Sequence, residues 1–228
     1  MTRKENNLCS ILVQARSQTR YLMTRLLKKL KKDHHAVIYV VCQTEEDKTF
    51  WECELRGVAS EVIVHKLLLE PHLLTVTNTT EVVEQGRLWE NRLGISVNEL
   101  VVGDRHLGRG FALGGSGHPR SRVSEKTTYE QMLSAIVQRL DFWHSCIERY
   151  GTTLVLDGEK SLSRLASWKG IEYRTLAPAR HESRYFWATN EYWENGELQR
   201  VYKNISPVNE EEKDAVDAPY ASLSLIHI

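Results

Sequence analysis

The sequence predicts a three-layer α/β domain, in which a parallel sheet lies between two layers of helices. Short apolar runs alternate along the chain with longer segments of helical hydrophobic spacing. Strands that alternate with helices form parallel sheets with helices on both faces. Because crossover connections are right-handed, the expected strand order of this Rossmann-like domain is 3-2-1-4-5. The expected strands lie near residues 8–14, 36–42, 61–65, 153–156 and 171–175.

Helical patterns fill the segments between these apolar runs. The first helix has Leu22, Leu26 and Leu30 on one stripe, and lysines crowd its last turns. Cations are favourable at a helix C-terminus, so a solvated face explains the lysines, with contact to anionic lipid as the alternative. Further helices are expected over residues 45–56, 127–150 and 161–168.

The whole chain is expected to hold one domain with two tails. A Rossmann-like domain over residues 8–203, with a helical insertion at about 78–126, follows a short tail over 1–7. The acidic segment 204–228 is expected to be a poorly ordered tail. Net charge is zero, which argues against a nucleic-acid partner, and no apolar run approaches the roughly 20 residues of a membrane span. The four cysteines form no Cys-x-x-Cys pair, so we expect free thiols and a reducing, cytoplasmic location.

Two short helices are predicted within residues 88–110. The first closes at Gly94, and the second opens on Ser96 as the N-cap, with Glu99 three residues later. This spacing is typical of a capping box.

The second of these helices is expected to end in Asp104-Arg105-His106, so that an acid, two arginines and an imidazole share its last turn and the exit from it. They are Asp104, Arg105, His106 and Arg109, and a loop rich in glycine and arginine comes next at 114–122. Glycine lets backbone approach a ligand closely, and arginine forks suit phosphate or carboxylate oxygens. The alternative is that Asp104 and Arg105 form a pair that merely caps a helix.

The switch point of the predicted sheet should gather further polar loops. Ligands of such sheets bind beyond the carboxyl ends of the strands, where the strand order reverses. Arg16 and Arg20 follow the first strand, Asp157 follows the fourth, and Arg180 and Arg184 follow the fifth. We therefore expect these side chains to surround one cleft.

Several enzyme classes lack their motifs here. The loop after the first strand contains no glycine, which argues against a nicotinamide or flavin enzyme. The sequence has no phosphate-binding Gly-x-x-x-x-Gly-Lys-Ser/Thr loop, no His-Glu-x-x-His and no Gly-x-Ser-x-Gly elbow. We therefore expect no cofactor and no metal.

The chain resembles bacterial surface-carbohydrate (capsular polysaccharide) biosynthesis proteins. More narrowly, it resembles the N-terminal Rossmann-like half of their two-domain, GT-B-type glycosyltransferases. The likeness covers most of residues 8–190, but the 114–122 loop does not map onto the family pattern. It rests on Trp-Glu-Asn-Arg-Leu-Gly-Ile-Ser at 89–96, Asp104-Arg105, a long helix opening near Tyr129, Asp157 at a strand tip, and Thr-Leu-Ala-Pro-Ala-Arg at 175–180, which is similar to a Thr-Pro-x-Arg loop.

The resemblance implies the acceptor-binding half of a metal-independent transferase. The partners it implies are a glycan or lipid-linked acceptor and a nucleotide-sugar donor, the latter held by a C-terminal domain that this chain is expected to lack. We therefore expect a fragment that is inactive alone, with the inner membrane as a candidate for peripheral contact. The candidate roles are Asp104 or Glu90 as the base, His106 or His181 as proton carriers, and Arg16, Arg20, Arg105 and Arg180 as anion holders.

Two alternatives from other classes remain open. One is a non-enzymatic sugar- or nucleotide-binding regulatory domain. The other is a flavodoxin-like interaction domain without a ligand.

Overall fold

A computed structural model describes residues 9–65, 74–102, 128–179 and 184–204 of the chain. The chain divides into two compact units, Met1–Arg174 and Thr175–Ile228, and each is described by itself. No helix in the described ranges has the length and apolar character needed to cross a membrane.

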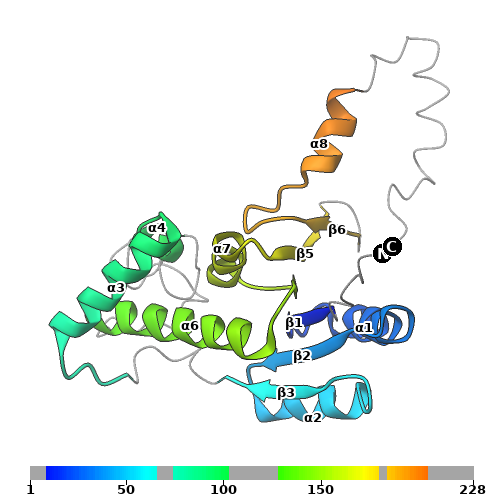
Figure 1. Ribbon diagram of the computed structural model, residues 1–228, viewed down its shortest axis with the longest axis horizontal. Helices are drawn as coiled ribbons and strands as arrows, with labels where there is room; N and C mark the ends of the chain where they lie inside the picture. Colours follow the sequence, from blue (N-terminus) through cyan, green and yellow to red (C-terminus); the bar gives the residue numbers. More distant parts are fainter. Residues whose placement is uncertain (1–8, 66–73, 103–127, 180–183, 205–228) are drawn as a thin grey trace, which may run out of the picture. The chain divides into compact units, whose positions relative to one another are not determined.

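The described strands form one mixed sheet in the order β3-β2-β1-β4-β5-β6 (Figure 1). β1 through β5 are parallel, which confirms the predicted order 3-2-1-4-5. The expectation of a wholly parallel sheet is wrong at its edge, because β6 pairs antiparallel with β5. The strands are β1 (Ser10–Gln14), β2 (Val37–Cys42), β3 (Glu61–Val64), β4 (Leu154–Leu156), β5 (Glu172–Pro178) and β6 (Tyr185–Ala188).

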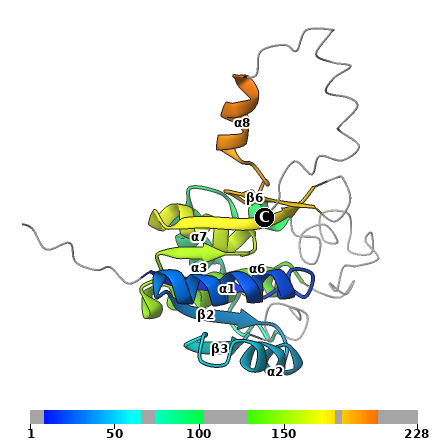
Figure 2. The ribbon, with the colours of Figure 1, turned by 90° about the vertical axis from the view of Figure 1, so that its right-hand side faces the viewer.

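In the first unit, helices cover both faces of the sheet. Seen from the side in Figure 2, α1 lies in front of the strands, while α3, α6 and α7 lie behind them. The first layer contains α1 (Arg20–His34) and α2 (Glu45–Glu54); the second contains α3 (Thr79–Leu93), α4 (Val97–Val102), α6 (Tyr129–Tyr150) and α7 (Lys160–Lys169).

Helix α1 turns a different stripe toward the sheet from the one its leucines predicted. Met23 and Leu27 are 1% and 0% exposed. The predicted residues Leu22, Leu26 and Leu30 are only half-buried and flank this stripe. The centre of the apolar face therefore lies one residue further along the chain.

The longest helix, α6, forms the core of the second layer. Leu140 and Trp143 are both 0% exposed and pack in one cluster with Leu12 of β1 and Val155 of β4. A capping box at Thr128 starts the helix. The predicted long helix is confirmed.

Helix α3 ends and helix α4 begins where the sequence predicted, although α3, with 15 residues, is not the short helix that was expected. Gly94 ends α3 in the left-handed conformation, with φ of 67°. The Ser96 hydroxyl accepts from the Glu99 backbone N–H at 3.2 Å, and the Glu99 carboxylate accepts from the Ser96 N–H at 3.0 Å. This reciprocal pair is the predicted capping box.

The second unit holds an antiparallel hairpin and one further helix that the sequence analysis missed. The fifth strand is longer than the predicted segment 171–175, because β5 continues to Pro178, which pairs with Tyr185 of β6. Asn195 then caps α8 (Gly196–Lys203) by accepting from the backbone N–H groups of Glu197 and Leu198, each at 3.0 Å.

Candidate functional site

The reversal of strand order lies between β1 and β4, and the loops that follow these strands contact each other. The Arg16 guanidinium lies 3.4 Å from the Asp157 carboxylate, measured from Nη1 to Oδ1. Its Nη2 donates to the Gly158 carbonyl at 2.9 Å. Two of the predicted site residues, Arg16 and Asp157, are therefore brought together from positions far apart in the sequence.

Asp157 is fully enclosed, with 0% exposure. The Thr19 hydroxyl donates to its Oδ2 at 2.7 Å, so the N-cap residue of α1 also holds this carboxylate. The backbone of Asp157 has φ of 59°, in the left-handed region that Asp tolerates better than most residues. Asp157 thus positions the β4–α7 turn against the loop after β1.

Arg16 lies at the boundary between this buried carboxylate and solvent. Its side chain is 31% exposed, against 1% for Asp157. A guanidinium has five N–H donors in a fixed fork, and the contacts with Asp157 and Gly158 involve two of its nitrogens. Arg16 therefore has donors left for an anion or a hydroxyl-rich ligand.

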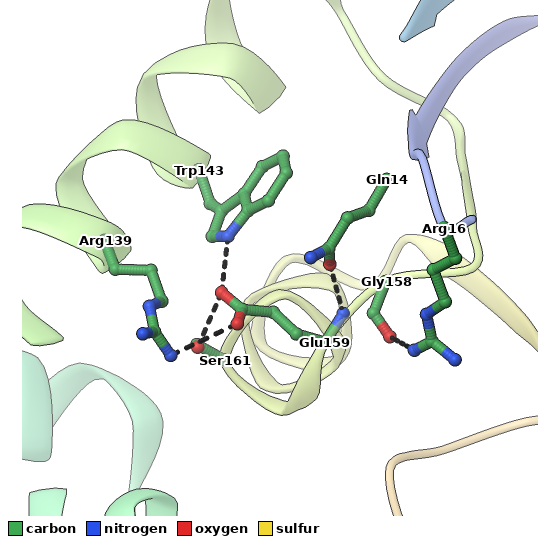
Figure 3. A network of polar contacts seen from close by, with 7 residues as sticks. All are labelled: Gln14, Arg16, Arg139, Trp143, Gly158, Glu159 and Ser161. Atoms are coloured by element: carbon green, nitrogen blue, oxygen red, sulfur yellow. Dashed lines mark hydrogen bonds and ion pairs between the residues drawn. The ribbon is translucent and has the colours of Figure 1, made fainter. Parts of the chain in front are cut away.

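The carboxylate of Glu159, two residues after Asp157, contacts three side chains, as Figure 3 shows. Its Oε2 lies 3.1 Å from Nη1 of Arg139. Its Oε1 accepts from the Trp143 indole N–H at 2.8 Å and from the Ser161 hydroxyl at 3.1 Å. The Arg139 side chain is only 6% exposed, so this ion pair is largely shielded from water.

The backbone of the same turn is also fixed. The Glu159 backbone N–H donates to the Gln14 side-chain carbonyl at 2.6 Å (Figure 3). The Tyr173 hydroxyl donates to the Gly158 carbonyl. The turn after β4 is thus tied to β1, to α6 and to β5, which makes it a rigid edge for a ligand site.

Gly158 fits this turn because it lacks a side chain. A Cβ there would lie 2.9 Å from Leu162 Cδ2 and 3.0 Å from Tyr173 Cε2, and both neighbours are buried. We expect Gly158→Ala to lower the free energy of unfolding by about 1–3 kcal/mol, measured by urea titration. Gly196→Ala is the matched control, because a Cβ added at this position would have no other atom within 4 Å. Equal effects of the two changes on the free energy of unfolding would contradict the prediction.

Glu90, a predicted candidate base, has a structural contact. Its Oε1 accepts from the backbone N–H of Val97, the first residue of α4, at 2.8 Å. The carboxylate therefore helps to cap a helix, because the first backbone N–H groups of a helix have no partner within it.

We expect Glu90→Ala to destabilise the protein by about 1 kcal/mol, since the Val97 N–H loses its acceptor. Glu90→Gln keeps an acceptor oxygen and should cost less. Thermal unfolding of both variants checks this, and equal losses would contradict the capping role.

Arg20 lies among aromatic rings. Its guanidinium carbon is 4.8 Å from the ring centroids of both Tyr21 and Phe50. Arg16 and Arg20 were predicted to share a cleft. Within the described residues, Arg16 contacts the Asp157 turn, whereas Arg20 contacts these two rings and donates from Nη2 to the Tyr21 hydroxyl at 3.1 Å.

The remaining predicted site residues belong to the second unit or lie outside the described residues. Arg184 belongs to the second unit, where its carbonyl accepts from the Ala179 N–H at 2.8 Å. Asp104, Arg105, His106, Arg109, Arg180, His181 and the 114–122 loop lie outside the described residues.

The sequence analysis did not single out Gln14, Arg139, Glu159 or His65. His65 follows β3, and burial, together with the charge of Arg139, lowers the pKa of this imidazole to about 4. The signal that would have indicated Arg139 is its position among the apolar residues of the long helix, where it is buried together with Val137 and Leu140. Within the described residues, no group of three His, Cys, Asp or Glu side chains is arranged to hold a metal ion.

Comparison with known proteins adds no family assignment. Neither a protein-family model nor a curated protein matches this chain.

Proposed function

We propose that this chain is the acceptor-binding half of a GT-B-type glycosyltransferase of surface or capsular polysaccharide assembly. The observation that carries the proposal is the β1–β4 edge, where Arg16 combines a buried anchor on Asp157 with 31% exposure of its side chain. Ligands of doubly wound sheets bind at this reversal of strand order. The class of ligand, a glycan or lipid-linked acceptor, is inferred from the resemblance of residues 89–96 and 175–180 to such enzymes.

The chemistry of the edge suits a glycan or lipid-linked acceptor. Arg16 offers a planar fork of donors, which pairs with phosphate oxygens or with neighbouring hydroxyl groups. The turn after β4 is held by Gln14 and by the Arg139–Glu159 pair, so it does not need to reorganise when a ligand binds. Cytoplasmic acceptor binding, with peripheral contact to the inner membrane, is part of this proposal.

Isothermal titration calorimetry tests the proposal with two ligand sets. One contains methyl glycosides and short oligosaccharides of common hexoses and N-acetylhexosamines, and the other contains nucleotide sugars. We expect the glycans to bind, and Arg16→Lys to weaken them about tenfold, because lysine keeps the charge but loses the fork. The control is Arg25→Lys on the exposed side of α1, and binding of nucleotide sugars alone would contradict the proposal.

We also expect this chain not to transfer sugar by itself. The proposal assigns the nucleotide sugar to a second domain, and transfer needs both substrates in near-attack geometry. The measurement is release of nucleotide from a panel of nucleotide sugars in the presence of glycans. Turnover above background that disappears in Asp104→Asn would contradict this expectation and indicate a small complete enzyme.

A regulatory domain that binds sugar without transferring it is the second candidate. The contact of Glu90 with the Val97 N–H favours it, because one candidate base is already used as a helix cap. Glycan binding without transfer, even after a donor-binding partner domain is added, would support this candidate over the transferase half.

A further inference from the structure

His65 lies at the same edge of the sheet, at the end of β3. Its backbone N–H donates to the carbonyl of Cys42, the last residue of β2, at 3.0 Å. The residue is only 8% exposed. It is therefore a buried imidazole at the carboxyl ends of the strands, where ligands of this kind of sheet bind.

The imidazole ring is fixed in orientation by Phe142 of α6. The two rings stack with centroids 3.6 Å apart and planes within 3°. Hydrogen bonds to imidazole nitrogens lie in the ring plane, so a partner must reach His65 at its edge and not through the stacked face.

The Nε2 atom of His65 is buried and has no hydrogen-bond partner in the part of the chain that the structure describes. Leaving a buried polar atom without a partner costs about 1–3 kcal/mol, so such atoms call for an explanation. By contrast, the carboxylates of Asp157 and Glu159 have hydrogen-bond partners, because their oxygens accept from neighbouring side chains.

One turn of α6 connects His65 to the β1–β4 edge. Phe142 stacks on His65, while Arg139 and Trp143 of the same turn hold the Glu159 carboxylate. Glu159 in turn donates its backbone N–H to Gln14 at the end of β1. The polar edge at the carboxyl ends thus extends from β4 to β3 along α6.

The charge around His65 favours a neutral partner. Arg139, whose charge acts on the imidazole, is paired with Glu159 at 3.1 Å, so the cation faces its own counter-ion. Burial and Arg139 hold the pKa of His65 at about 4, which keeps the ring neutral near pH 7. A neutral imidazole offers one donor and one acceptor, and a hydroxyl group matches either.

We propose that Nε2 of His65 is a recognition point for a hydroxyl group of a neutral sugar bound at the carboxyl ends of β3 and β4. This inference rests on the proposed function, because it extends the same acceptor site to a second contact. It commits to a hydroxyl and not to an anion.

Nitrogen NMR of the imidazoles in the full-length chain, with methyl glycosides and inorganic phosphate as separate probes, tests the inference. We expect a glycoside to shift the Nε2 resonance of His65, and phosphate to leave it unchanged. His65→Phe keeps the stack on Phe142 and should weaken glycoside binding at least about fivefold, the equivalent of one lost hydrogen bond. His65→Gln, which restores a polar group, should recover part of that loss, and circular dichroism checks that both variants fold.

Three results would overturn the inference. The first is a glycoside that binds without shifting Nε2, with full affinity for His65→Phe. The second is a phosphate-induced shift with a raised pKa, which would indicate an anion site. The third is a panel in which no glycoside binds; this result rejects the proposed function as well, whereas binding that depends on Arg16 but not on His65 rejects only the inference.

Discussion

Glu159→Ala should be among the most destabilising single substitutions in the first unit, with a loss of about 3–4 kcal/mol in the free energy of unfolding. It removes the counter-ion of Arg139, whose side chain is 6% exposed, and leaves the Trp143 indole N–H without its acceptor. Breaking a buried ion pair costs more than the pair itself contributes, because the remaining charge stays buried. Urea unfolding monitored by tryptophan fluorescence measures the effect.

Glu172→Ala is the matched control for this change. Glu172 also pairs with an arginine, Arg174, at 2.6 Å, but its side chain is 66% exposed. Exposed pairs contribute between zero and about 1 kcal/mol. A double-mutant cycle between Glu159→Gln and Arg139→Met should give a coupling energy of about 1–3 kcal/mol, and additive losses would show that the pair does not stabilise the edge.

Asp157→Ala should lower the free energy of unfolding by about 3 kcal/mol. The carboxylate is 0% exposed and accepts from the Thr19 hydroxyl at 2.7 Å while it faces Arg16 at 3.4 Å. We place the loss at the lower end of the range for buried pairs, because Arg16 is 31% exposed and regains water. Alanine also tolerates the left-handed backbone, with φ of 59°, less well than aspartate.

Asp157→Asn separates charge from shape, since asparagine keeps the size and adopts the same backbone conformation. We expect a smaller loss of about 1–2 kcal/mol. Asp33→Ala serves as the control, because Asp33 pairs with Lys29 at 2.7 Å on the exposed side of α1, where losing an ion pair has little effect on stability. A loss for Asp157→Ala as small as that for Asp33→Ala would contradict the role of Asp157 in holding together the loops that follow β1 and β4.

Most of the fold could be predicted from local sequence patterns. The order of the parallel strands follows from the alternation of apolar and helical segments. Gly94 and Ser96 indicate helix ends, because the interactions of a helix cap involve neighbours within a few residues. The antiparallel strand β6 was missed because residues 175–180 resembled a loop that follows a strand. In the structure, Pro178 is the last residue of β5 and pairs with Tyr185 of β6, beyond the residues 172–174 that pair with β4.

The candidate site was only partly predictable, because its contacts join distant parts of the chain. Arg16 and Asp157 were predicted to meet, since topology alone brings the ends of β1 and β4 together. The role of Glu159 was missed because the partners of its carboxylate, Arg139 and Trp143, lie inside the long helix, where neither residue type signals a contact with a distant loop. His65 was missed because neither its burial nor its stack on Phe142 leaves a sequence signal.

The most direct test of acceptor binding at the β1–β4 edge is a chemical-shift map of the full-length, isotopically labelled chain. Glycans of the panel should shift the side-chain signals of Arg16 and Gln14 and the backbone amides of residues 157–159, while nucleotide sugars should leave them in place. Shifts confined to other parts of the chain, or shifts of this edge by nucleotide sugars but not by glycans, would contradict acceptor binding at the ends of β1 and β4.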